Sequence, residues 1–294
     1  MRIDKILVPT DFSPTSILAL QHAMTLARKC RGRLTLLHVI ESATAFTSDF
    51  PDETLQIQRN HIDQAQRMLH ALVGPEEWNA LELRTVVKTG DIADEILATA
   101  RDEGMDFLVM GAHGRGFFGR SVIGSVTQKL LGRLRIPILI VRQLVPVPAF
   151  GRMLFATDLS EASREALHRV LELAQATQSN VIAVNVVDVG LEGGAEAAVY
   201  LGEQRLKEAR AKLHEFKAEL HEENLEVEAV LAETSLAATI IKAAEEHHDD
   251  VIAITASPNG LVAEAVIREA HIPVLSIPVQ VTATQESPAE APAA

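Results

Sequence analysis

The stretch Asp106-Phe-Leu-Val-Met-Gly111-Ala-His-Gly114-Arg-Gly-Phe-Phe-Gly-Arg-Ser-Val-Ile-Gly124-Ser125 joins a short apolar run to a glycine-rich segment. Residues 107–110 have the composition of a buried strand, and the apolar periodicity of 126–134 predicts a helix. The glycines therefore lie in a turn between a strand and a helix. Glycine lets backbone N–H groups approach a ligand, and a helix start leaves N–H donors unpaired. We interpret the stretch as a phosphate-binding loop.

Two familiar phosphate-loop patterns fit these glycines only formally. Gly114-Arg-Gly-Phe-Phe-Gly119 has the dinucleotide spacing G-x-G-x-x-G, but the next predicted strand, 137–141, is followed by Arg142 and not by an acidic residue. Residues 114–121 imitate a P-loop, in which Arg120 stands where a lysine belongs. Each pattern stays an alternative, as does a glycine-rich surface turn that binds nothing.

A third pattern, Gly111-x2-Gly114-x9-Gly124-Ser125, resembles the nucleotide-binding signature of the universal stress protein family at every specified position. Its long spacing argues against chance agreement. The resemblance implies ATP or AMP as the ligand. A triphosphate could bring Mg²⁺ with it, but the sequence assigns no protein ligand to such an ion.

Length and composition predict a soluble cytoplasmic protein. The 294 residues suit two domains of ordinary size, and 47% apolar residues suffice for two hydrophobic cores. No apolar run reaches the roughly 18 residues that span a bilayer, and Met1–Lys5 lead directly into a predicted strand without signal-peptide features. Cys30 is the only cysteine, which excludes an internal disulfide and a cysteine-based zinc site.

The net charge of −13 is distributed unevenly. Residues 1–148 carry 17 basic and 16 acidic side chains, whereas 149–294 carry 10 and 24. Only the first half is therefore favourable for a polyphosphate. With one Trp and one Tyr, the acidic chain lacks the basic stripe and stacking aromatics of nucleic-acid-binding proteins. We expect neither a nucleic acid nor a membrane as a partner.

An internal repeat organises the chain. Lys5-Ile-Leu-Val-Pro-Thr-Asp-Phe-Ser13 returns as Arg152-Met-Leu-Phe-Ala-Thr-Asp-Leu-Ser160. Likewise, Arg135-Ile-Pro-Ile-Leu-Ile-Val141 returns as His271-Ile-Pro-Val-Leu-Ser-Ile277. Two copies of one domain therefore lie in tandem.

We place the first repeat at 1–145 and the second at 149–280. The join falls near 143–151, where Val-Pro-Val-Pro favours an extended linker. Residues 281–294, rich in Ala, Pro, Glu and Ser, are expected to form a disordered tail.

Strands alternate with helices in both repeats. In the first repeat we expect strands at 6–9, 34–40, 83–87, 107–110 and 137–141, and helices at 14–30, 53–72, 92–103 and 126–134. In the second we expect strands at 153–156, 181–187, 225–230, 251–254 and 273–277, and a long helix at 194–222. Alternation favours right-handed crossovers. The fold class is α/β: two tandem doubly wound, five-stranded parallel sheets, Rossmann-like, with strand order 3-2-1-4-5.

This strand order places a ligand crevice at the carboxyl ends of the first and fourth strands. Thr10 and Asp11 end the first strand, and Gly111 ends the fourth, so these two turns should converge. Asp11 could accept hydrogen bonds from an adenine amino group or ribose hydroxyls; the alternative is that it caps the first helix. Ser13 and Pro14 also have the residue types of a helix cap and a first helical position.

The family resemblance assigns the remaining contacts. It implies adenine contacts by the backbone at Val39 and ribose contacts by the backbone around Met110 and Gly111. Pro9 and Thr10 match the wall beneath the base. The phosphates fall on Gly114, Gly124, Ser125 and Val126. Arg115, together with Arg120, could add charge pairing with phosphate.

The second repeat departs from the pattern in its loop. Thr255 takes the place of Gly111 and Gly260 that of Gly124, which makes the loop 8 residues shorter. Leu261 replaces the serine, and Pro258 removes a backbone donor. We therefore expect this hollow to be closed and the chain to bind one nucleotide. Thr157-Asp158 is retained, which leaves a weak or cryptic second site as the alternative.

We predict no catalytic residues, since the chain has neither a P-loop lysine nor a recognisable Ser/His/Asp arrangement. Slow ATP hydrolysis or self-phosphorylation at Ser121 or Ser125 remains an alternative, as does a nucleotide-free scaffold. The sequence does not decide whether the chain binds a metal ion. We interpret the run His247-His248-Asp249-Asp250 as a helix end and not as a metal site.

The expected function is that of a stress-response regulatory switch or interaction module. The apolar fifth strands would leave exposed sheet edges. We expect these edges to pair within the chain. The hypothesis also includes a homodimer of the whole chain and a protein partner whose identity the sequence does not give.

Overall fold

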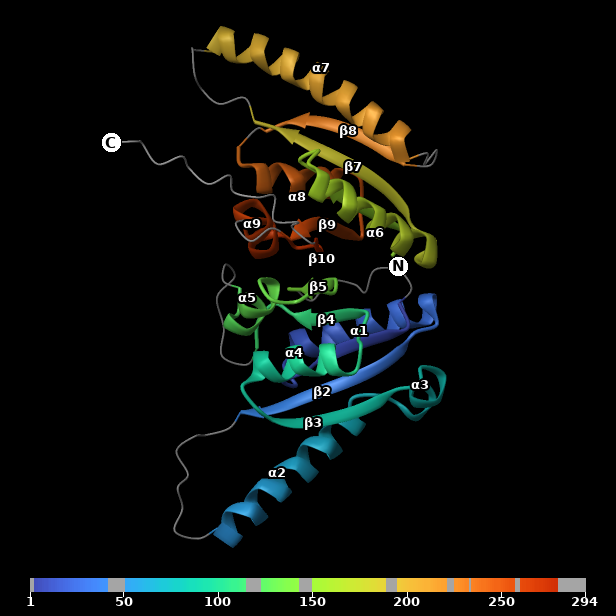
Figure 1. Ribbon diagram of the computed structural model, residues 1–294, viewed down its shortest axis with the longest axis vertical. Helices are drawn as coiled ribbons and strands as arrows, with labels where there is room; N and C mark the ends of the chain where they lie inside the picture. Colours follow the sequence, from blue (N-terminus) through green and yellow to red (C-terminus); the bar gives the residue numbers. More distant parts are fainter. Residues whose placement is uncertain are drawn as a thin grey trace, which may run out of the picture.

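A computed structural model describes residues 3–41, 51–114, 123–142, 150–188, 195–220, 225–232, 234–256 and 260–279, without the side chains of 51–55 and 195–199. Most of the expected linker and the expected tail lie outside these ranges. Figure 1 shows the two repeats one above the other along the long axis, with α2 (Pro51–Ala71) and α7 (Ala195–Leu220) at opposite ends.

Ten strands form one continuous sheet in the order β3-β2-β1-β4-β5-β10-β9-β6-β7-β8. The strands are β1 (Lys5–Pro9), β2 (Arg33–Glu41), β3 (Arg84–Gly90), β4 (Phe107–Gly111), β5 (Ile138–Val141), β6 (Arg152–Ala156), β7 (Asn180–Val187), β8 (Glu226–Leu231), β9 (Val251–Ala256) and β10 (Val274–Pro278). Each half has the order 3-2-1-4-5. The α/β fold class and the strand order predicted from the alternation are therefore confirmed.

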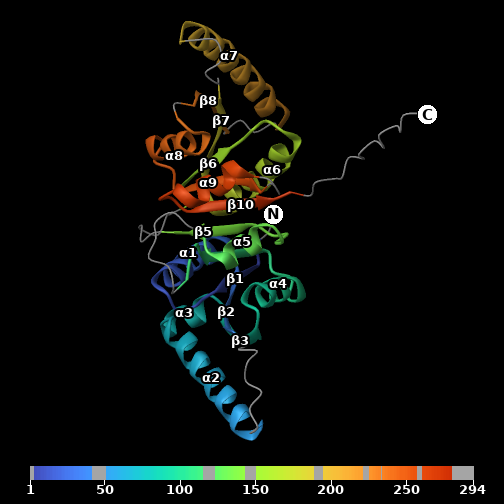
Figure 2. The ribbon, with the colours of Figure 1, turned by 90° about the vertical axis from the view of Figure 1, so that its left-hand side faces the viewer.

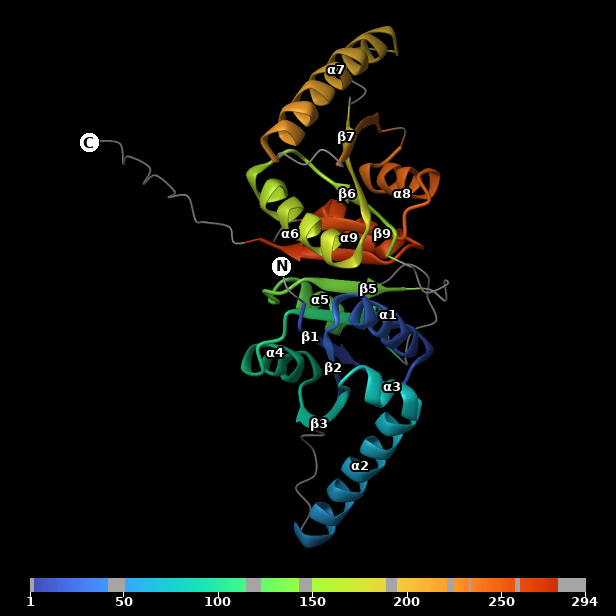
Figure 3. The same ribbon diagram turned by 90° about the vertical axis from the view of Figure 1, so that its right-hand side faces the viewer.

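The two halves meet at their fifth strands. β5 and β10 pair antiparallel, with Leu139 opposite Leu275, whereas the other strand pairs described are parallel. Figures 2 and 3 show these two strands side by side at the middle of the molecule. The edge pairing within the chain that we expected is present.

Helices cover both faces of the sheet. The others besides α2 and α7 are α1 (Pro14–Cys30), α3 (Pro75–Ala80), α4 (Ile92–Asp102), α5 (Ser125–Leu131), α6 (Glu161–Thr177), α8 (Leu236–Glu246) and α9 (Leu261–Glu269). Figures 2 and 3 show α1 and α4 on opposite sides of one half, and α6 and α8 on opposite sides of the other. In the described part of the chain, no helix combines the length and the apolar character needed to cross a bilayer.

Each face of the sheet has its own hydrophobic core, and each core runs through both repeats. The first core takes Ile6 and Val8 from β1 with apolar residues of α1 and α6; the second takes Leu7 with residues of α4, α5, α8 and α9. The alternation follows from the pleat of a strand, in which successive side chains point to opposite faces. Two large cores are present, as the composition predicted, but they are divided by the face of the sheet and not by repeat. Because the fifth strands pair, the faces of the two half-sheets merge.

Matching polar contacts fix the strand starts in both repeats. Asp106 Oδ2 accepts hydrogen bonds from the N–H groups of Asp4 and Lys5, both at 2.9 Å. Asp250 Oδ2 does the same for Gly151 and Arg152, at 2.6 and 3.2 Å. These bonds hold β4 against the start of β1, and β9 against the start of β6. The internal repeat is thus visible at the level of single hydrogen bonds.

Several elements differ from the expectation. No range was predicted for α6, α8 and α9, and β3 continues to Gly90, beyond the expected 87. α3 was not predicted, although Pro75 lies in its first turn with Glu76 and Glu77 beside it. α5 ends at Leu131, before the expected 134, with Gly132 as its C-cap in a right-handed conformation.

Candidate functional site

A cavity of about 620 Å³ opens at the carboxyl ends of β1, β2 and β4. Every predicted site residue that the structure describes lines it: Pro9, Thr10, Asp11, Val39, Met110, Gly111, Gly114, Gly124, Ser125 and Val126. Arg115 lies outside the described residues. The lining also includes residues that sequence reasoning missed, among them Ser16, His38, Glu41, Ile92, Ile96 and Thr127. A cavity therefore lies at the place where the topological argument predicts the ligand crevice.

The turn from β1 to α1 presents Asp11 to this cavity. Asp11 Oδ1 accepts from the N–H of Ser13 at 3.0 Å, and Thr10 Oγ1 accepts from the N–H of Phe12 at 3.0 Å. Phe12 adopts a φ of 64° in this turn. The alternative in which Asp11 caps α1 is wrong, because the N-cap is Ser13, whose hydroxyl accepts from the N–H of Ser16 at 3.2 Å.

The glycines of the signature permit close contacts around Asp11. A Cβ atom on Gly114 would lie 2.5 Å from Asp11 Oδ2, so the backbone after β4 passes directly against the carboxylate. A Cβ on Gly111 would lie 3.1 Å from the backbone carbon of Thr15. Residue 114 has to be a glycine if the carboxylate keeps its place.

The two ends of the segment 115–122 lie together on the cavity wall. The N–H of Gly124 donates to the carbonyl of Ala112 at 2.9 Å, and Thr127 Oγ1 donates to the same carbonyl at 3.2 Å. Thr15 Oγ1 donates to the carbonyl of His113 at 2.8 Å, which ties this wall to α1. The described residues on either side of 115–122 are thus held together beside the cavity.

The opposite end of the cavity is formed by β2 and α4 and is largely apolar. The paired register of β1 and β2 ends at Pro9 and Leu37, with the N–H of Thr10 donating to the carbonyl of Leu37 at 2.8 Å. Alternate residues of a strand direct their backbone groups to the same side. The N–H and C=O of Val39 therefore point toward the side of β1, beyond its last paired residue. Ile92 and Ile96 line the same end.

His38 closes the cavity floor between these strands. Its Nδ1 lies 2.8 Å from the carbonyl of Thr10. A carbonyl only accepts, so Nδ1 carries the proton in this contact. The described lining contains the acidic residues Asp11 and Glu41, while the arginines of this region, Arg115 and Arg120, belong to the segment 115–122.

The second repeat keeps a cavity of about 590 Å³ at the equivalent place, between β6, β7 and β9. The expectation that its hollow is closed is wrong. Its described walls come from the ends of β6, β7 and β9 and from Leu236 and Ile240 of α8, the counterpart of α4 in the first repeat, and Thr255 in the place of Gly111 leaves the space open. Leu261 and Val262 line its rim.

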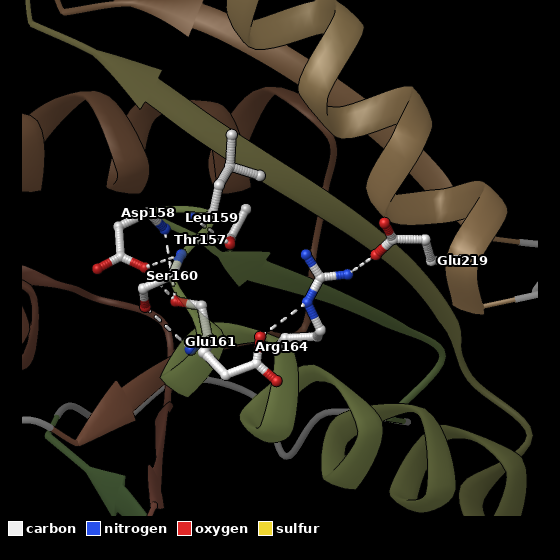
Figure 4. A network of polar contacts seen from close by, with 8 residues as sticks. Thr157, Asp158, Leu159, Ser160, Glu161, Arg164 and Glu219 are labelled. Atoms are coloured by element: carbon white, nitrogen blue, oxygen red, sulfur yellow. Dashed lines mark hydrogen bonds and ion pairs between the residues drawn. The ribbon is translucent and has the colours of Figure 1, made fainter. Parts of the chain in front are cut away.

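Figure 4 shows the polar network beside this second cavity. Asp158 Oδ1 accepts from the N–H of Ser160 at 3.0 Å and from the hydroxyl of Ser163 at 2.5 Å. Burial opposes ionisation of Asp158, but these hydrogen bonds outweigh it and lower the pKa of the carboxyl. Asn185 Nδ2 donates to the carbonyl of Thr157 at 2.7 Å. In the first repeat His38 makes the equivalent contact with the carbonyl of Thr10.

The histidine and aspartate run after α8 contacts side chains of β6 and β8. His247 is the C-cap of α8, as the interpretation of a helix end predicted, and its Nε2 lies 2.6 Å from Glu228 Oε2. Asp249 is buried against Arg152, and burial raises the pKa of its carboxyl to about 6. Among the described residues, no three histidine, cysteine or acidic side chains gather as a metal site would require.

Comparison with known proteins identifies the class. The model of the universal stress protein family matches residues 2–142 and 149–278, and the chain belongs to this family. Universal stress protein MJ0577 of Methanocaldococcus jannaschii is 28% identical over 153 residues, which cover 47% of this chain and 94% of that protein. One repeat thus corresponds to nearly a whole relative.

Longer relatives match more of the chain. A universal stress protein of Mycolicibacterium smegmatis is 27% identical over 194 residues, covering 63% of this chain and 65% of its own length. The crystal structure of a universal stress protein from Archaeoglobus fulgidus superposes with a TM-score of 0.69 at 20% identity, covering 95% of this chain and 99% of that one. The tandem arrangement therefore occurs in a solved structure with the same fold.

Proposed function

We propose that the first repeat binds an adenine nucleotide, ATP or AMP, and that its occupancy sets conformation or partner choice during a stress response. One observation carries this proposal: the predicted contact residues come from the ends of β1, β2 and β4 and from the start of α5, yet they line one cavity. Its size falls in the range of small-molecule sites, about 300 to 1,000 Å³.

The cavity has two chemically different ends, as a nucleotide has. Val39, Ile92 and Ile96 offer an apolar end for a base, with the Val39 backbone available for hydrogen bonds to its edge. Asp11 lies between the ends, where it can accept from ribose hydroxyls or an amino group. The backbone around Gly114 and Gly124 lies at the other end, and the sequence between these glycines includes Arg115 and Arg120. Phosphates belong there.

Isothermal titration of the full chain with ATP and with AMP tests the proposal. We expect saturable binding by the first repeat, and a loss of affinity of about 10- to 100-fold in Asp11→Asn, because a charge-assisted hydrogen bond contributes about 1.5–3 kcal/mol. Asn keeps an oxygen for the Ser13 N–H, so the turn survives. Gly114→Val should abolish binding, since its side chain would displace the Asp11 carboxylate.

Asp158→Asn is the matched control, because Asp158 occupies the equivalent turn of the second repeat. It should leave ATP affinity unchanged. A chain that binds neither ATP nor AMP would be a nucleotide-free scaffold, and the proposal would fail. ATP turnover above background that disappears in Asp11→Ala would instead support the alternative of a weak ATPase.

A further inference from the structure

The second cavity has the same kinds of residues as the first at its apolar end and beside it. Thr157 and Asp158 follow β6 as Thr10 and Asp11 follow β1, and the register pairs Ala156 with Val184 as it pairs Pro9 with Leu37. Position by position, Val186 then takes the place of Val39, and Ile240 that of Ile96. All four of these residues line their respective cavities. The apolar end and its carboxylate are thus present twice in the chain.

The part of the second cavity near the start of α9 is apolar, unlike the corresponding part of the first cavity. Leu261 stands in the place of Ser125 and is 80% exposed, and Val262 beside it is 37% exposed. An apolar rim without a cation disfavours a phosphate group and favours an apolar surface.

Asp158 adds a negative charge to this cavity. One of its oxygens is held by Ser160 and Ser163, and the other points away from that network (Figure 4). Among the described residues that line the second cavity there is no Lys, Arg or His. The free direction of the carboxylate suits an N–H or O–H donor and repels an anion.

We propose that the cavity of the second repeat binds an uncharged nucleoside, with its base on the apolar wall and its hydrogen-bond donors on Asp158, and that it rejects phosphate esters. The choice of a nucleoside rests on the nucleotide proposed for the first cavity, whose apolar half it shares. The rejection of phosphate rests on the second cavity alone. The chain would then sense a phosphorylated and an unphosphorylated form of one kind of molecule at two sites.

The test uses the full chain with Gly114→Val, which blocks the first cavity, and titrates it calorimetrically with adenosine and with AMP. We expect one saturable adenosine site. AMP should bind at least about 10-fold more weakly than adenosine, because its phosphate would find no cation there and would be repelled by the Asp158 carboxylate. Adding Asp158→Asn should weaken adenosine by about 10-fold or more, since it removes a charge-assisted hydrogen bond.

Leu261→Arg provides a second variant that carries no folding risk, because its side chain is exposed. It should raise AMP affinity about fivefold or more while changing adenosine affinity less than about twofold, because an arginine pairs with phosphate. The proposal is overturned if the Gly114→Val chain shows no saturable adenosine binding, or if AMP binds it as tightly as adenosine.

The same measurements separate this proposal from the function of the first repeat. ATP binding to the Asp158→Asn chain without adenosine binding to the Gly114→Val chain would refute the second site alone. Adenosine binding to the Gly114→Val chain, with no ATP binding to the wild type, would refute the first site and support the second.

Discussion

His22 is a buried titratable residue with no role in the proposed site. It lies on α1 at 0% exposure, and neither ring nitrogen has a hydrogen-bond partner within the described residues. Burial lowers its pKa from 6.5 to about 4. The unfolded chain therefore takes up the proton at a higher pH than the folded chain. The free energy of unfolding that depends on a neutral His22 is therefore at its full value above pH 6.5. It decreases as the pH falls toward 4.

We predict that His22→Leu removes this pH dependence. Between pH 7.5 and pH 5 the wild type should lose roughly 2 kcal/mol more of its free energy of unfolding than the variant, by linkage. Urea denaturation at the two pH values measures the difference. Carboxylates elsewhere, including Asp249 with its opposite sign, titrate in both proteins and cancel. An equal loss in both proteins would show that His22 is not held neutral by the fold.

Sequence reasoning found the polar and glycine residues of the site but not all of its apolar wall. Asp11 and Gly114 follow directly from strand ends, which topology brings together. His38 and Ile96 line the cavity only because of the register between β1 and β2 and the way α4 packs on the sheet. These tertiary relations leave no local signal. The survival of the second cavity was missed for the same reason, since its walls depend on packing and not on the loop.

At the scale of elements, the approach of α1 to the end of β4 depends on Gly111. A Cβ there would lie 3.1 Å from the backbone carbon and 3.2 Å from the backbone nitrogen at the start of α1. The second repeat has Thr255 at this position, with its hydroxyl 3.4 Å from Ser163 Oγ. The start of α6 therefore leaves room for the side chain of Thr255. The contacts between this helix and its strand differ from those of α1 with β4.

We predict that Gly111→Ala moves the start of α1 away from β4, breaks the bond from Thr15 to His113, and costs about 1–3 kcal/mol of stability by overpacking. Gly132→Ala is the control, because nothing lies within 4 Å of its added Cβ. That change should be close to neutral. Thermal unfolding of the two variants decides the matter, and equal melting temperatures would contradict the packing role of Gly111.

Most elements were predictable because each carries its own pattern, and the exceptions are short. The strands of the sheet are apolar runs separated by turn residues, and α1 has both its cap and its proline in the sequence. The helix α3 spans only Pro75–Ala80, with no buried residue of its own to create a periodicity. In such a short helix, with Trp78 as its one large apolar residue, only the first-turn residues predict the helix.

At the scale of the whole molecule, the repeats share their cores. Leu139 of β5 and Leu275 of β10 lie opposite each other and belong to the first core, and Lys29 Nζ donates to the carbonyl of Thr177 at 2.7 Å across the two halves. The internal repeat predicted two units and the pairing of their edges. It could not predict the merging of the cores, since the sequence of one repeat does not show which helices meet across the join.

A shared core implies that the chain unfolds as one unit, because neither half can keep its packing when the other is lost. Trp78 is the only tryptophan, and it packs against the first core from α3 in the first repeat. Its fluorescence therefore reports the first half, while far-UV circular dichroism reports all helices. We expect the two transitions to coincide in urea.

Leu275→Ala in the second repeat tests this coupling directly. Leu275 is 1% exposed, and truncating a buried leucine costs about 2–5 kcal/mol. If the chain is cooperative, the Trp78 transition should move to lower urea by the full amount, although the substitution lies in the other repeat. Glu203→Ala, on the exposed surface of α7, should leave it in place. A Trp78 midpoint unmoved by Leu275→Ala, with a dichroism curve split into two steps, would mean that the two repeats unfold independently despite their common sheet.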